Sequence, residues 1–283
     1  MTEIKLSIGY EDYENGKKMD EALEELAGRP EAAELTDLII GDWGGAYENS
    51  SELIVEALVR LKDRFPALKS LFIGDMGFEE CEVSWIMQSN LNPLFGAFPD
   101  LTSLTVKGST DLELGEIEHA RLEELTIICG GLGSRVLASI AEAKLPALKK
   151  LELYIGIEDY GFDGTTEDVL AVAKPGLFPN LTYLGLKDSE IQDEIAEAIA
   201  ESDILDRLDT LDLSEGTLSD AGAQALLDSA KVRALNVLDL HYHYMSADMT
   251  RRIQSELPNA NVDERQEADV YNGEEYRSPM LTE

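Results

Sequence analysis

The stretch Leu208–Leu240 reads LDTLDLSEGTLSDAGAQALLDSAKVRALNVLDL. It begins with a Leu-x-x-Leu-x-Leu frame, continues through a turn and an Ala/Leu-rich segment, and ends with the same frame again. The fourth and sixth residues of the frame are two positions apart, so on a β-strand both side chains point to one face. The stretch therefore predicts a unit made of one strand, one turn and one helix, with copies that stack side by side.

The frame recurs eight times along the chain, with Ile or Val accepted as its last residue. The copies begin at Leu35, Leu68, Leu101, Leu122, Leu148, Leu181, Leu208 and Leu235. A degraded ninth copy begins at Leu257. Successive copies start about 21 to 33 residues apart, and most steps are close to the roughly 20–29 residues of a strand-plus-helix repeat. This repetition predicts a single solenoid domain over residues 1–283, with an N-terminal cap at 1–34, repeats at 35–262 and a C-terminal tail at 263–283.

The segments between the frames are predicted to return as helices. Apolar residues have helical spacing in Glu52–Phe65, Leu132–Ala143 and Thr166–Ala173. Asp193 and Asp220 each precede an Ala-rich run, where helix N-caps are expected. In Val83–Phe95 the pattern is less regular, and Pro93 limits how far a helix could extend. We therefore expect an α/β fold with a curved parallel sheet on the concave side and helices on the outer side.

The segment Leu211–Gly222, LDLSEGTLSDAG, followed by AQALLDSA, resembles the ribonuclease-inhibitor-like class of leucine-rich repeats. The resemblance extends from Leu35 to Val262, and the whole chain is similar to a bacterial cytosolic family of such proteins with no assigned chemistry. It implies a binding scaffold. The class places Asn or Cys three residues after the last frame leucine, and this chain departs from that pattern. The corresponding residues are Trp43, Met76, Ser109, Gly130, Gly156, Ser189, Gly216 and His243. Buried backbone groups of these turns therefore need other partners.

The net charge of the chain limits the classes of molecule that it can be expected to bind. The chain carries 23 Lys and Arg against 57 Asp and Glu, which gives a net charge of −34. Such an acidic chain disfavours nucleic acid and anionic membrane surfaces. Cys81 and Cys129 imply no disulfide framework and fit a reducing compartment. The first residues lack the pattern of a secretory signal, and no run approaches the roughly 18 apolar residues of a membrane helix. We therefore expect a cytoplasmic protein.

The residues that flank the fourth and sixth frame positions are expected to form the open face of the sheet. Aromatic side chains on a rigid sheet are good interface anchors, and polar neighbours add specificity. The insertion Gly156–Asp168 is the longest excursion between frames and could form a rim of the site. Long loops that cover the face are the competing interpretation. The residues predicted to bind a partner are Phe72, Tyr154, Tyr183, Lys187, Asp212, Asp239 and His241.

Other functions have weaker signals. Asp239, His241 and His243 alternate along one strand and could hold an ion such as Zn²⁺, although His243 falls in a turn position. The glycine-rich run Cys129–Ser134 lacks the Gly-Lys-Ser/Thr ending of a phosphate-binding loop, so a repeat turn explains it better. No nucleophile motif is present. The sequence thus predicts a protein-binding scaffold that is not an enzyme and needs no cofactor. A metal-binding protein or metal-dependent enzyme and a self-associating structural protein are the alternatives.

Overall fold

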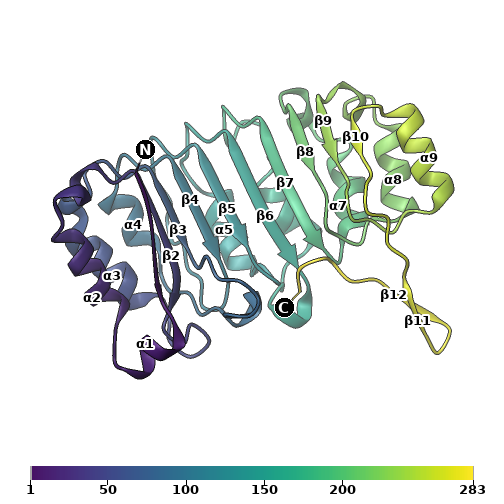
Figure 1. Cartoon of the computed structure of the whole chain (residues 1–283). Coiled ribbons are helices and arrows are strands. Elements are labelled where there is room, and N and C mark those ends of the chain that lie inside the picture. The colour runs from purple at the N-terminus through teal and green to yellow at the C-terminus, as the bar shows by residue number, and fades with distance from the viewer. Residues whose placement is uncertain (1, 283) are drawn as a thin grey trace. The chain divides into compact units, whose positions relative to one another are not determined.

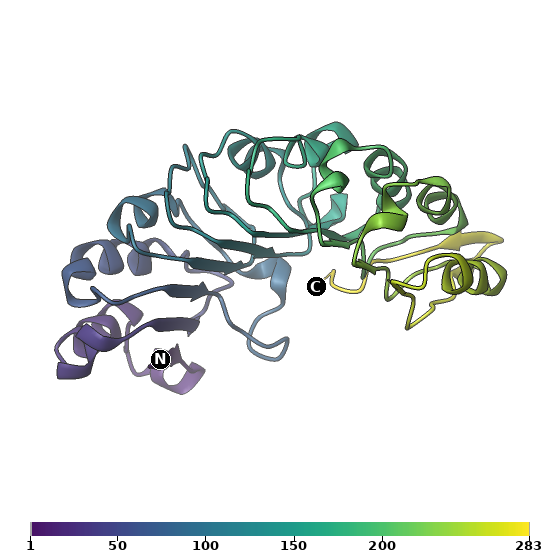
Figure 2. The ribbon, with the colours of Figure 1, turned by 90° about the horizontal axis from the view of Figure 1, so that it is seen from above.

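A computed structural model describes residues 2–282 of the chain (Figure 1). The chain forms two compact units. The first contains residues 2–129 and Glu142–Leu148, and the second contains Gly130–Ala141 and Lys149–Thr282. Each unit has parallel strands with helices along one face, as seen from above in Figure 2. This confirms the predicted α/β repeat architecture.

The first unit has five parallel strands, each paired with the next one along the chain. The four that carry a frame place equivalent frame residues opposite one another, so that Leu38 faces Leu71 and Leu71 faces Leu104. All three of these side chains are fully buried, because the frame leucines of stacked repeats pack on one another in the core. The strands are β1 (Glu3–Ile8), β2 (Asp37–Trp43), β3 (Ser70–Ile73), β4 (Ser103–Lys107) and β5 (Glu124–Ile128).

The helices of the first unit follow the expected segments, with one correction. They are α1 (Tyr10–Glu14), α2 (Met19–Ala27), α3 (Glu52–Leu61) and α4 (Asn92–Ala97), with short 3₁₀ turns at Pro30–Glu34, Lys62–Arg64 and Val83–Trp85. Pro93 stands in the first turn of α4 rather than near its end. A proline is tolerated there because the first turn of a helix has no partner for its N–H groups. Pro93 therefore begins a helix instead of ending one.

The second unit repeats the pattern and adds a hairpin. Its parallel strands are β6 (Lys150–Gly156), β7 (Tyr183–Ser189), β8 (Thr210–Asp212), β9 (Val237–Asp239) and β10 (Ala260–Asn261). The degraded ninth frame thus still forms a strand, β10. The antiparallel strands β11 (Asp269–Tyr271) and β12 (Glu274–Tyr276) form an exposed hairpin in the tail.

Some helices of the second unit are capped across repeats. They are α5 (Ser134–Ala141), α6 (Thr166–Ala171), α7 (Gln192–Ile199), α8 (Asp220–Asp228) and α9 (Ala247–Glu256). Asp193 does not cap its own helix α7; its Oδ1 instead accepts from the N–H groups of Ser219 (2.7 Å) and Gly222 (3.0 Å) at the start of α8. Asp220 likewise accepts from the N–H of Ser246 at the start of α9, at 2.6 Å. The prediction that these aspartates cap their own helices was therefore wrong.

Several side chains take over the role of the missing turn asparagine. In the last turn, His243 is fully buried; its Nε2 lies 3.1 Å from the Val262 carbonyl oxygen, and its Nδ1 accepts from the N–H of Met245 at 3.2 Å. After β7, the amide of Gln192 donates to the Leu186 carbonyl at 2.9 Å. The turns therefore satisfy their backbone groups with residues of several types, which explains why no single residue type recurs at this position.

The two ends of the chain lie outside the repeat frame. Strand β1 and helices α1 and α2 precede the first frame, in the segment predicted to be an N-terminal cap. The tail folds back after β12, and residues 277–282 return to the ends of β7 and β8 (Figure 1). None of the helices in the described part of the chain has the length and apolar character to cross a membrane.

Candidate functional site

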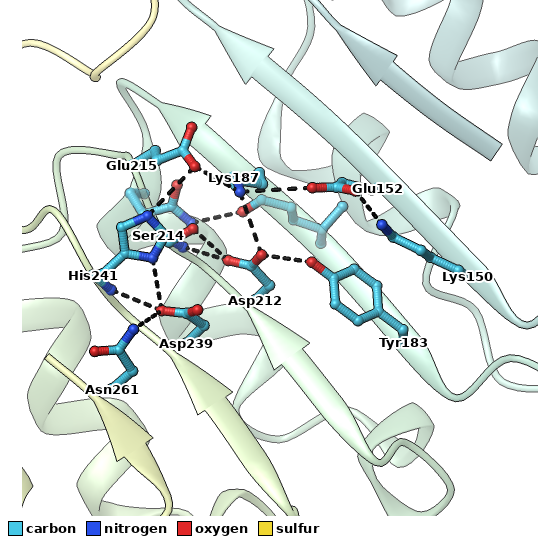
Figure 3. Close-up of polar contacts among 12 residues, drawn as sticks. Lys150, Glu152, Tyr183, Lys187, Asp212, Ser214, Glu215, Asp239, His241 and Asn261 are labelled. Carbon is cyan, nitrogen blue, oxygen red and sulfur yellow. Dashed lines mark hydrogen bonds and ion pairs between the residues drawn. The ribbon is translucent and has the colours of Figure 1, made fainter. Parts of the chain in front are cut away.

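The candidate site is the face of β6–β9 opposite the helices. Alternation along these strands puts the frame leucines into the core and the residues between them on this face. Figure 3 shows that Tyr183, Lys187, Asp212, Asp239 and His241 lie there within one polar network. Tyr154 joins it through its ring, which lies 5.0 Å from Lys187 Nζ. Six of the seven predicted residues are thus brought together, whereas Phe72 lies half-buried on β3 in the first unit.

Lys187 is the centre of this network. Its side chain is only 6% exposed, and its Nζ lies 2.7 Å from Glu215 Oε1, 3.4 Å from Asp212 Oδ2 and 3.6 Å from Glu152 Oε1. Burial by itself would lower the pKa of Lys187. The carboxylates of Asp212 and Glu215 outweigh this effect and raise the pKa of Lys187 above its usual value. Lys187 is therefore a fixed positive charge.

Asp212 is a fixed negative charge beside it. The carboxylate accepts from the Tyr183 hydroxyl at 2.6 Å, and from the backbone N–H and hydroxyl of Ser214 at 3.0 and 2.5 Å. Burial would raise the pKa of Asp212, but the charge of Lys187 and these hydrogen bonds hold it below its usual value. The two charges therefore stabilise each other in a site that excludes most water.

The two tyrosines of the face are held protonated. Burial raises the pKa of Tyr154 and of Tyr183, and the neighbouring carboxylate of Asp212 adds to the effect at Tyr183. Lys150 Nζ lies 5.0 Å from the centre of the Tyr183 ring and 2.7 Å from Glu152 Oε2. Both rings thus lie against lysine side chains, with cation–π contacts that fix their orientation.

His241 closes the network on the side of β9. Its Nδ1 is 2.8 Å from Asp239 Oδ1, and its Nε2 is 3.5 Å from Glu215 Oε1. Asn261 on β10 donates to the same Asp239 oxygen at 3.0 Å. Both ring nitrogens of His241 therefore face carboxylates of this chain.

The metal site considered from the sequence does not form. His243 points into the core, where backbone groups occupy both of its ring nitrogens. Among residues 2–282, no group of three or more His, Cys, Asp or Glu side chains has an arrangement that could hold a metal ion. The period-two pattern was misleading because the strand ends at Asp239, and the chain turns before His243.

Glu215 is the main member of the network that the sequence analysis missed. It follows β8 in the turn, with a left-handed backbone (φ 64°), and its carboxylate contacts both Lys187 and His241. The frame assigns faces only to strand residues, so it gave no orientation for a turn residue. The available signal was an acidic residue next to the turn glycine Gly216, one position beyond the face residue Ser214.

Comparisons with known proteins agree with this architecture. A family model described as "Leucine Rich repeat" matches residues 179–200 and 208–227. A crystal structure of a protein from Bacteroides fragilis is 36% identical, with a TM-score of 0.89, and the match covers 98% of this chain and 77% of that chain. The comparison with curated proteins gives no significant match. The stacked frames, the matching repeat model and this similarity over nearly the full length show that the chain belongs to the leucine-rich-repeat family.

Proposed function

We propose that this chain is a non-enzymatic scaffold that binds a protein partner through the face of β6–β9 and the adjacent loops. Leucine-rich-repeat domains generally mediate protein–protein interaction, which supports the broad assignment. The observation that carries the choice of face is the network around buried Lys187. The residues that form the proposed site on this face are Tyr154, Tyr183, Lys187, Asp212, Asp239 and His241, and Phe72 on β3 is a further proposed contact.

A network of this kind favours recognition over chemistry. The lysine, the carboxylates and the tyrosines are bound to one another, so their positions are set before a partner arrives. Preorganised side chains lose little conformational entropy on association, which increases the affinity available from a given contact area. The half-exposed rings of Tyr154 and Tyr183 supply the aromatic anchors that dominate many interfaces. The tyrosines would make the main contacts, and Lys187 and Asp212 would hold them in place.

Affinity capture from the native cell extract tests the face directly. We compare the wild-type chain with a Tyr154→Ala/Tyr183→Ala variant, with Phe72→Ala tested separately. The matched control is Tyr271→Ala/Tyr276→Ala, which removes two exposed aromatic side chains of the β11–β12 hairpin. We expect the face variant to lose a specific partner that the control retains. If the face variant retains every captured protein, the proposal fails.

Self-association is distinguished by solution mass. Light scattering on the wild-type chain and on the face variant reports whether the face joins two copies of this chain. A dimer that dissociates in the face variant would identify a second copy as the partner. If the wild-type chain and the face variant have the same solution mass, the face does not join two copies, and the captured protein is the partner.

A further inference from the structure

Residues 277–282, here called the strap, make a second set of contacts at the carboxyl ends of the strands. After the β11–β12 hairpin, the strap passes the turn that follows β9 and reaches the turn that follows β8 and the end of β7. Figure 1 shows this yellow segment returning to the ends of the central strands of its unit. The strap therefore contacts earlier repeats, although in the sequence it follows the last one.

The strap is held almost entirely through its main chain. The N–H of Met280 donates to the Glu215 carbonyl at 2.8 Å, and the N–H of Leu281 donates to Asp188 Oδ1 at 2.7 Å. The Ser278 carbonyl accepts from the hydroxyls of Tyr244 (2.9 Å) and Tyr242 (3.3 Å). Pro279 is buried, whereas the side chain of Met280 is 55% exposed. These contacts recognise an extended backbone around one buried proline.

The surface that receives the strap is shaped for a polypeptide. We call it the notch, and it consists of Gly130, Asp188, Glu215, Tyr242 and Tyr244. Asp188, Glu215 and Tyr242 occupy equivalent positions in three successive repeats, two residues after the last frame leucine, and all three have a left-handed backbone, with φ between 55° and 64°. Residues with side chains adopt this conformation at a cost, and it persists where the surrounding structure enforces it. At Gly130, a Cβ would lie 2.5 Å from the Thr282 carbonyl oxygen, so only glycine allows the strap to approach this closely.

The strap fills the notch incompletely. Asp188 is fully buried, and its Oδ1 bonds the strap. Its Oδ2 is also buried but finds no hydrogen-bond partner within residues 2–282. A buried polar atom without a partner is costly, so a segment that brought a hydrogen-bonding group to Asp188 Oδ2 would bind more favourably than the strap does. The notch can therefore make a hydrogen bond, at Asp188 Oδ2, that the strap does not provide.

We propose that the notch is a recognition site for an extended, proline-containing segment of another protein, and that the strap occupies it in the free chain as an intramolecular competitor. Sites of this kind obtain affinity from main-chain hydrogen bonds and specificity from a few pockets. Tethering gives the strap a high effective concentration, so an external segment binds well only when the strap is displaced. The proposal rests on other residues than the sheet-face site, because the hydrogen bonds of the strap go to Asp188, Glu215, Tyr242 and Tyr244.

The test uses the full chain with a disabled strap. In the Pro279→Asp/Leu281→Pro variant, a charged group replaces the buried proline, and the N–H that bonds Asp188 is lost. Met280→Ala is the matched control, because it changes an exposed side chain and keeps the bonded N–H. The probe is a fluorescent peptide amide of the strap sequence, RSPMLT, and binding is followed by fluorescence anisotropy. Hydrogen exchange at residues 278–282 reports whether the strap is released.

We expect the disabled variant to bind the peptide saturably and at least tenfold more tightly than the wild type or the Met280→Ala control. Adding Asp188→Ala to the disabled variant should abolish this gain, as should replacing the peptide with RSPMPT. A released strap without any gain in peptide binding would overturn the proposal. So would a strap that stays protected from exchange in the disabled variant, because the contacts described above would then not be those that hold it. The outcome of the capture experiment with the Tyr154→Ala/Tyr183→Ala variant does not affect these expectations, because they depend on the notch alone.

Discussion

Lys187 is buried almost as completely as the frame leucines around it, yet it carries a charge. Three carboxylates surround its ammonium group, and the strands on which they lie are set by the repeat frame. The cost in stability of a substitution in this cluster depends on which charges remain unpaired afterwards. Deleting one partner of a buried ionic cluster leaves the others without compensation, which costs more than the net stability of the intact cluster.

We therefore expect Lys187→Met to lower the free energy of unfolding by about 3–5 kcal/mol, as measured by urea denaturation. Adding Glu215→Gln should restore part of that loss, because one uncompensated carboxylate is removed. Lys5→Met is the control: it breaks an ion pair with Asp75 in which both side chains are more than one-third exposed, and should cost less than about 1 kcal/mol. A double variant less stable than Lys187→Met alone would contradict this account.

Asp188 gives a prediction about pH. Burial raises the pKa of its carboxyl to about 8 from an ordinary value of 3.8, against the opposing effect of the Leu281 N–H, while Glu215 raises it further and Lys187 lowers it. Between these values the folded chain holds a proton that the unfolded chain releases, so stability falls as pH rises from about 4 to about 8. The slope from this one group is at most about 1.4 kcal/mol per pH unit.

Asp188→Asn removes this titration and keeps an acceptor for the Leu281 N–H. We expect urea denaturation at pH 5, 6.5 and 8 to show that the variant gains stability relative to the wild type as pH rises. A constant difference between the two proteins over this range would show that Asp188 is ionised throughout in the folded state.

At the scale of elements, three helices of the second unit, α5, α8 and α9, receive a carboxylate from another repeat at their first turn. Asp193 in α7 satisfies N–H groups at the start of α8, and Asp220 in α8 does the same for α9. Asp163, in the loop before α6, accepts from the N–H of Ser134 at the start of α5. A helix begins with N–H groups that have no partner inside the helix, so these carboxylates add to the local caps, such as Ser219 for α8 and Ser246 for α9.

We expect Asp193→Ala to lower the free energy of unfolding by about 0.5–2 kcal/mol, the usual cost of losing a cap. Hydrogen exchange should locate the loss at the start of α8 rather than in α7, where the substituted residue lies. The control is Asp228→Ala in the last turn of α8, where the acidic side chain accepts from Gln224 and opposes the helix dipole. Faster exchange confined to α7 would contradict capping between repeats.

How well these elements can be predicted depends on how far apart in the sequence the residues that determine them lie. The frame is local, so each copy that was read from the sequence became a strand, including the degraded copy at β10. The caps join residues 26 to 29 positions apart, and no local pattern indicates whether Asp193 faces its own helix or the next one. The metal interpretation of His243 was wrong for a related reason, because the end of β9 was set by pairing between strands.

The candidate site was predicted only in part. Alternation placed Tyr183, Lys187 and Asp212 on one face, and the structure agrees. It suggested an open face, whereas carboxylates from three neighbouring segments close around Lys187 and bury it. Glu215 and the strap were beyond prediction, because a turn residue and a tail outside the repeat frame have no assigned direction until the fold is complete.

At the scale of the whole molecule, the net charge of −34 opposes compactness. Like charges repel one another more strongly in the folded chain than in the expanded one, and added salt screens this repulsion. Most surface ion pairs of this chain are exposed and contribute little in return.

We therefore expect the thermal unfolding midpoint to rise by at least about 2 °C between 10 mM and 500 mM sodium chloride, since each kcal/mol corresponds to about 2–4 °C in chains of comparable size. Potassium chloride should give the same rise, because screening does not depend on the identity of the cation. A midpoint that falls with salt would mean that attractive pairs outweigh the net repulsion.

The direction of the caps on α8 and α9 has a consequence for how the chain is made. Asp193 is synthesised before α8, and Asp220 before α9, so each of these helices emerges from the ribosome after the carboxylate that will bind its first turn. Folding of chains during synthesis proceeds from the N-terminal side, and repeats dock onto neighbours that are already formed. For α8 and α9, each finished repeat thus offers a template for the next one, whereas α5 receives the carboxylate of Asp163 from a segment made after it.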